Sequence, residues 1–201
     1  ARLARLGYQA DPNALDGQWG HFQVMGGGVD ADRLLGRLGN PYTLSWPGVS
    51  VKPYPCGSLS HPSMDTLLDL ILEHDVKPEQ VEEVRLGAGN NILNPLRYQE
   101  PQNELEAKFS LQFCLGILVL RRRASIQEFT DEVVQSAEVV EMMKRVKTYH
   151  SPEVEARGAD RIRSLVEVRL KDGRVLSAEA EISRGTPDRP MGRDGMAVKF
   201  N

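Results

Sequence analysis

Apolar residues recur three or four positions apart in the stretch that follows His61, and acidic residues fill many of the positions between them. The apolar set is Met64, Leu67, Leu68, Ile71 and Leu72. This spacing is typical of an amphipathic helix that buries one face. We expect the helix to begin at about Ser60.

A second apolar stretch runs from Glu104 to Arg122 and is the longest in the chain. It leaves little polar surface in its middle, which predicts a buried helix that crosses the face of a sheet. Shorter helices are expected over residues 126–133, where Ser125 is the expected N-cap, and 137–144.

Alternation of apolar and polar residues predicts the strands. One strand is expected over residues 81–86 and another over 146–150. The runs 160–171 and 174–183 flank the dipeptide Asp172-Gly173, which is a strong hairpin signal. Helices followed by strands indicate an α+β fold: an antiparallel sheet of about four strands with helices packed on one face.

A rigid loop is predicted directly before the first amphipathic helix. Pro53 lacks an N–H and fixes its own φ, so a strand over residues 49–51 must end near Lys52. Gly57 then allows a sharp turn into the helix. The loop brings four polar side chains close to the helix N-terminus, where a carboxylate is favoured; they are Lys52, Tyr54, Ser58 and His61.

Composition narrows the classes of partner and compartment. The 201 residues carry a net charge of −3, which gives no reason to expect nucleic acid or an anionic membrane as a partner. No apolar run approaches the roughly 20 residues of a transmembrane helix. The two cysteines, Cys56 and Cys114, form no CxxC pair, so we expect neither a zinc site nor a disulfide framework. These features predict a cytoplasmic protein.

Three motifs, in order, resemble those of the MmgE/PrpD family. The first is Lys52-Pro-Tyr-Pro-Cys56 followed by His61-Pro-Ser-Met-Asp65. The second is Ala14-Leu-Asp-Gly17 with Gly20 and Phe22, and the third is Glu106-Ala-Lys-Phe-Ser-Leu-Gln-Phe113. Enzymes of that family dehydrate 2-methylcitrate, decarboxylate cis-aconitate or epimerise iminodisuccinate, and they require no metal or other cofactor.

The resemblance implies a domain organisation. Residues 1–28 would be the end of, and the connector from, an N-terminal helical domain of the same protein. Residues 29–185 would form the α+β domain, and residues 186–201 a tail that is altered or shortened. The full protein would be a homodimer acting on a small di- or tricarboxylate, and the isolated chain would be inactive. An alternative is a non-catalytic binding or interaction module that keeps the fold.

The resemblance and the residue chemistry together suggest site residues. Lys52 is the first candidate, either as a partly desolvated proton carrier or as a cation that holds a carboxylate. His61 is the second titratable candidate. Five residues are candidates for substrate binding: Tyr54, Ser58, Arg97, Tyr98 and Lys108. Gly57-Ser58 stands where some relatives carry a basic or bulky residue, which leaves the choice of substrate open.

Overall fold

The computed structural model describes residues 2–36, 38–40, 42, 44–46 and 48–200. The chain divides into two compact units, residues 1–48 and 49–201. The first unit contains three short helices, α1 (Arg2–Arg5), α2 (His21–Gly26) and α3 (Ala31–Leu35). Asp30 caps α3, since its carboxylate accepts from the Arg33 N–H at 3.1 Å. None of these helices buries a residue.

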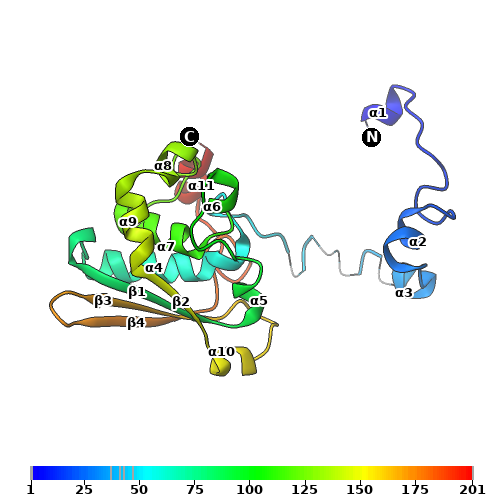
Figure 1. Ribbon diagram of the computed structural model, residues 1–201. Helices are drawn as coiled ribbons and strands as arrows, with labels where there is room; N and C mark the ends of the chain where they lie inside the picture. The colour runs from blue at the N-terminus through cyan, green and yellow to red at the C-terminus, as the bar shows by residue number, and fades with distance from the viewer. Residues whose placement is uncertain (1, 37, 41, 43, 47, 201) are drawn as a thin grey trace. The chain divides into compact units, whose positions relative to one another are not determined.

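The second unit holds the remaining elements (Figure 1). In chain order they are η1 (Ser58–Ser60), α4 (His61–Glu73), η2 (Pro78–Gln80), β1 (Val81–Ala88), α5 (Asn90–Leu93), α6 (Glu104–Ala107), α7 (Leu111–Arg121), α8 (Asp131–Val134), α9 (Ala137–Arg145), β2 (Val146–His150), α10 (Pro152–Ala156), β3 (Ser164–Leu170), β4 (Val175–Ala180) and α11 (Arg193–Phe200). Across the described residues, no helix has the length and apolar character needed to cross a membrane.

The four strands form one sheet in the order β2-β1-β3-β4. β1 pairs antiparallel with β3, and β3 pairs antiparallel with β4 across the Asp172-Gly173 turn, as the hairpin signal predicts. The α+β prediction is confirmed, but the sheet is mixed rather than purely antiparallel, because β1 and β2 run parallel. The connection over residues 89–145 is long and helical, as a parallel pair requires.

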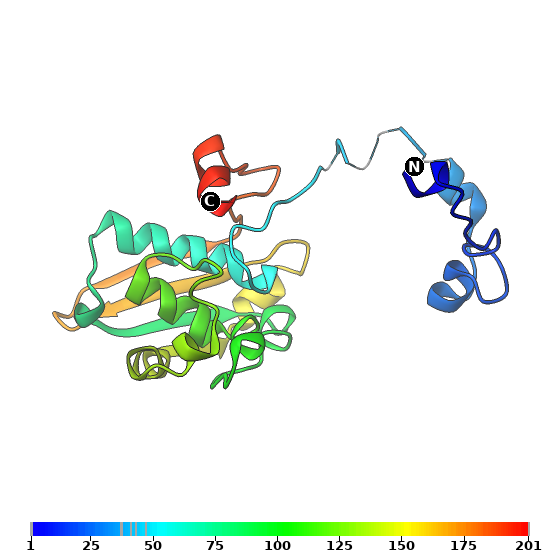
Figure 2. The ribbon, with the colours of Figure 1, turned by 90° about the horizontal axis from the view of Figure 1, so that it is seen from above.

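The helices cover one face of this sheet, as expected. α4 lies against β3 and β4, and α7 lies against β2 and packs on α9. Figures 1 and 2 show these helices on the same side of the strands. Along β3 the burial alternates, so that Val166 and Val168 face the helices while Glu167 and Arg169 lie on the other face.

Two predicted helices differ from the structure. The stretch 104–122 is broken into α6 and α7, because the Ser110 hydroxyl caps α7 by accepting from the Phe113 N–H at 3.1 Å. Residues 126–133 do not form one helix that starts at a Ser125 cap. Instead the Ser125 N–H and hydroxyl donate to Glu128, and Thr130 caps the shorter α8.

The strand expected before Lys52 is also absent, since residues 49–52 have no regular structure. The Val51 N–H donates instead to the Gly185 carbonyl at 2.7 Å. The helix after the loop begins at His61, close to the predicted start. The loop is therefore held by the C-terminal segment and not by the sheet.

Candidate functional site

The loop that carries Lys52 packs onto the connection between α6 and α7. The Gly57 N–H donates to the Lys108 carbonyl at 2.8 Å. A Cβ at Gly57 would lie 2.9 Å from the Leu96 side chain and 3.4 Å from that same carbonyl. Glycine therefore permits a close approach that brings the loop beside Lys108.

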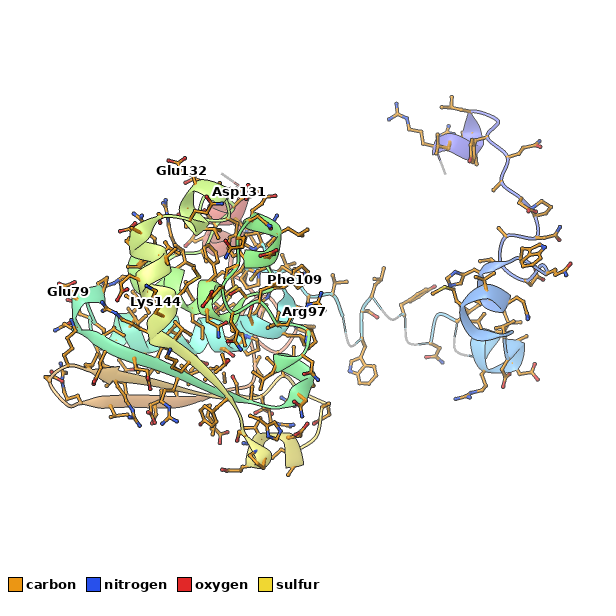
Figure 3. The ribbon with its side chains drawn as sticks, viewed as in Figure 1. Glu79, Arg97, Phe109, Asp131, Glu132 and Lys144 are labelled. Atoms are coloured by element: carbon orange, nitrogen blue, oxygen red, sulfur yellow. The ribbon has the colours of Figure 1, made fainter. Side chains whose placement is uncertain are left out.

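The segment that contains Arg97 and Tyr98 also contacts the connection between α6 and α7. Arg97 forms a β-bridge with Ser110, and the Tyr98 N–H donates to the Phe109 carbonyl at 3.4 Å. Figure 3 shows Arg97 and Phe109 side by side at one end of the second unit. The structure thus gathers three of the predicted segments around one backbone connection.

The segments that meet here carry three cations, each with a local partner. The exposed Lys52 ammonium donates to the Cys56 carbonyl at 3.2 Å. The half-buried Lys108 lies 3.4 Å from the Glu104 carboxylate. The exposed Arg97 guanidinium lies 5.4 Å from the centre of the Tyr98 ring. A hydrogen bond with the Tyr98 side chain raises the pKa of Arg97. With the exposed hydroxyl of Ser58, these groups offer donors suited to carboxylates.

Lys52 does not have the burial that we expected for it. The prediction placed it in a partly desolvated position at a strand end, but there is no strand and the side chain is exposed. An exposed ammonium with one carbonyl contact is suited to binding a carboxylate.

Tyr54 and His61 belong to the core rather than to this group of donors. Tyr54 is buried, and its hydroxyl donates to Asp65 Oδ1 at 2.6 Å. Burial, together with the adjacent Asp65 carboxylate, raises the pKa of Tyr54 far above its ordinary value. His61 is 2 % exposed, its ring meets the Tyr54 ring edge-on at 5.5 Å, and its Nε2 atom has no hydrogen-bond partner.

Two residues of this region escaped the sequence reasoning. Asp65 falls on the polar face of the helical pattern, yet it is fully buried. Arg184 lies after the hairpin, and its side chain reaches Asp65 and the Tyr54 hydroxyl. No local signal pairs residues so distant in sequence. The only hint was Asp65 at the end of the first motif.

The two cysteines are neighbours, with Cys56 in the loop and Cys114 in α7. Both are free and buried, and Cys56 Sγ lies 3.4 Å from the Ser60 hydroxyl. A hydrogen bond from Cys114, with others from His61 and Ser60, lowers the pKa of Cys56 in spite of its burial. Among the described residues, no group of three or more His, Cys, Asp or Glu side chains is placed to hold a metal ion.

A separate groove of about 600 Å³ lies along the free edge of β2. None of the predicted site residues lines it, although Gln99 directly follows Tyr98. Its lining is mixed, with amide side chains and the lysines Lys144 and Lys147 over an apolar floor that includes Val140 and Met143. The groove therefore does not coincide with the loop site.

A mixed four-stranded sheet with helices on one face, and a proline-bounded lysine loop packed against those helices, define an α+β domain. This architecture is consistent with an MmgE/PrpD C-terminal domain. The profile of the MmgE/PrpD C-terminal domain matches residues 54–201, and the chain therefore belongs to the MmgE/PrpD family. The match begins two residues after Lys52.

The chain is also similar to a curated protein, the cis-aconitate decarboxylase of Mus musculus. The two are 23% identical over 209 residues, which cover 98% of this chain and 41% of that relative. The chain thus spans less than half of the relative's length. Family membership and this relative support a lyase-like role at the level of the family.

Proposed function

We propose that this chain is the C-terminal α+β domain of a lyase or isomerase that acts on a small di- or tricarboxylate. The observation that carries the proposal is the convergence of the segments that contain Lys52, Arg97 and Lys108 around the Gly57–Lys108 backbone contact. Three cations from separate segments suit a substrate with two or three carboxylates. Similarity to a cis-aconitate decarboxylase supports the same substrate class.

In this proposal each side chain has a stated role. Lys52, Arg97 and Lys108 bind carboxylates. Ser58 and Tyr98 are hydrogen-bond donors beside them. The reaction removes a proton next to a carboxylate, and the cations stabilise the negative charge that develops there. We place His61 beneath the site, because it is buried in the core.

The other half of the cleft lies outside these 201 residues in our proposal. An N-terminal helical domain of the same protein would supply the remaining acid–base groups, the full protein would act as a homodimer, and no metal or cofactor would be needed. The chain alone would then be inactive. A cytoplasmic location is supported by two buried cysteines without a disulfide.

The test compares the full-length protein with its Lys52→Ala variant on citrate, 2-methylcitrate, cis-aconitate and iminodisuccinate. We expect the parent to turn over at least one substrate and the variant to lose about 100-fold or more in kcat/KM. A loss of this size is typical when a side chain positioned at the reacting group is removed. Lys171→Ala is the matched control, because Lys171 is an exposed lysine beside the β3–β4 turn.

The two failures have different meanings. No turnover of any substrate, with specific binding retained, would favour the non-catalytic module. A Lys52→Ala variant as active as the parent would remove Lys52 from the proposal.

A further inference from the structure

The backbone on both sides of Lys52 is held by residues that follow β4. The Val51 N–H donates to the Gly185 carbonyl at 2.7 Å, and the Lys199 ammonium donates to the Lys52 carbonyl at 2.7 Å. Figures 1 and 2 show this C-terminal part beside the start of the second unit. The loop has no regular structure of its own, so these contacts set its position.

Arg184 holds the other side of the loop through a partly buried network. Its Nε donates to Asp65 Oδ1 at 2.8 Å, and its backbone N–H donates to Asp65 Oδ2 at 2.6 Å. Its Nη2 reaches the Tyr54 hydroxyl at 2.7 Å, and that hydroxyl also donates to Asp65. Asp65 is fully buried and the Arg184 side chain is 40% exposed, so these charge-assisted contacts are shielded from water on the side of the carboxylate.

Gly185 lets the two backbones approach. It has φ of +83°, and a Cβ there would lie 2.0 Å from the Val51 carbonyl oxygen. The obstacle is backbone and not a flexible side chain, so any larger residue must push the loop away. The glycine therefore fixes the position of Val51, the residue before Lys52.

We propose that Arg184 and Gly185 are positioning residues that aim Lys52 at the substrate. Arg184 fixes Tyr54, two residues after Lys52, and Gly185 fixes Val51, one residue before it. Displacement of a substrate-positioning group by about 1 Å can cost on the order of 100-fold in rate. This inference rests on the proposed function, since it requires Lys52 to contact substrate.

The test is a double-mutant cycle in the full-length protein with Arg184→Lys and Lys52→Ala. Arg184→Lys keeps the positive charge. Its single ammonium group lacks the planar set of N–H donors with which the guanidinium contacts both Asp65 and Tyr54. We expect it to lower kcat/KM roughly tenfold or more in the parent and less than about twofold in the Lys52→Ala background. A residue that acts only on stability would lower activity by the same factor in both backgrounds, which would overturn the proposal.

Two further variants keep the result interpretable. Gly185→Ala displaces the same loop from the opposite side. We expect it to lower kcat/KM in the parent and much less in the Lys52→Ala background, as for Arg184→Lys. Arg157→Gln is the control, because Arg157 also pairs with a carboxylate, that of Glu179, but both side chains are exposed. It should retain parental kcat/KM.

Hydrogen exchange gives a readout that does not depend on turnover. We expect faster exchange in peptides covering residues 49–56 in Arg184→Lys and Gly185→Ala, and parental exchange in Arg157→Gln. Unchanged exchange in both loop variants would contradict the positioning role. If Lys52→Ala is itself fully active, Lys52 has no role in the proposed function and cannot be aimed at a substrate, and the exchange result still shows whether the loop is held by Arg184 and Gly185.

Discussion

Glu128 is a nearly buried acid whose two carboxylate oxygens both have donors. One oxygen accepts from Arg123 Nε at 2.7 Å, and the other accepts from the N–H and hydroxyl of Ser125, each at 2.7 Å. Burial opposes ionisation, but the Ser125 hydrogen bonds and the Arg123 charge together hold the pKa of Glu128 below its ordinary value. The ionised form is thus favoured in the folded state.

This shift predicts a pH dependence of stability. A lowered folded-state pKa contributes stability above the unfolded pKa, and this stability is lost as pH falls through the folded pKa. We expect the free energy of unfolding to fall more steeply in the parent than in Glu128→Gln between about pH 5 and pH 3. Urea unfolding across that range measures it. Parallel curves for the two proteins would contradict the prediction.

Gly116 and Gly173 differ in whether their backbone conformation accepts a side chain. Gly116 lies inside α7, where a Cβ would meet Met142 Cγ at 3.5 Å, an ordinary contact distance. Gly173 lies in the β3–β4 turn with φ of +88° and open space around it. The helix would accept alanine without strain, whereas the turn needs the left-handed conformation.

Alanine at these positions should therefore have opposite effects. We expect Gly116→Ala to raise the free energy of unfolding by about 0.5–1 kcal/mol, because glycine is a poor helix former. Gly173→Ala should lower it by about 1–2 kcal/mol through backbone strain. Chemical denaturation of residues 1–201 tests both. A destabilised Gly116→Ala would mean that the α7–α9 contact has no room for a methyl group.

At the scale of the whole molecule, the two units differ in the burial of their apolar side chains. The core cluster lies entirely within residues 54–180. Among the described residues of 1–48, the large apolar side chains other than the half-buried Phe22 are exposed, among them Leu6, Tyr8, Trp19 and Trp46. Exposed apolar surface of this kind is typical of a region that is covered in a larger assembly.

Both tryptophans of the chain lie in this first unit, so the tryptophan fluorescence of the 201-residue chain reports on the first unit alone. Trp19 is 84% and Trp46 71% exposed. We expect the 201-residue chain to emit as solvated tryptophan. The full-length protein should emit at shorter wavelength, because the proposed N-terminal helical domain would cover the unit. Trp46→Phe isolates the signal of Trp19, provided that any tryptophans outside the 201 residues are replaced as well. Equal emission from Trp19 in the two proteins would contradict the covered state.

Local patterns account for most of the elements. The helical spacing after His61, the alternation in β1 and the Asp-Gly turn each depend on neighbours in the chain, so α4, β1 and the hairpin were predictable. The break between α6 and α7 was not, because a single serine hydroxyl competes with a strongly apolar run. The parallel β1–β2 pair depends on how a long connection crosses the sheet, which no local signal specifies.

The α+β class, the family resemblance and the three segments that carry Lys52, Arg97 and Lys108 could all be predicted from the amino-acid pattern. Which side chains of the loop face outward became evident only from the folded chain. The tertiary structure buried Tyr54 and His61, left Lys52 exposed, and paired Asp65 with Arg184. The physical reason is that burial of a polar group is settled by the partner it finds, and here the partner is more than a hundred residues away in the chain.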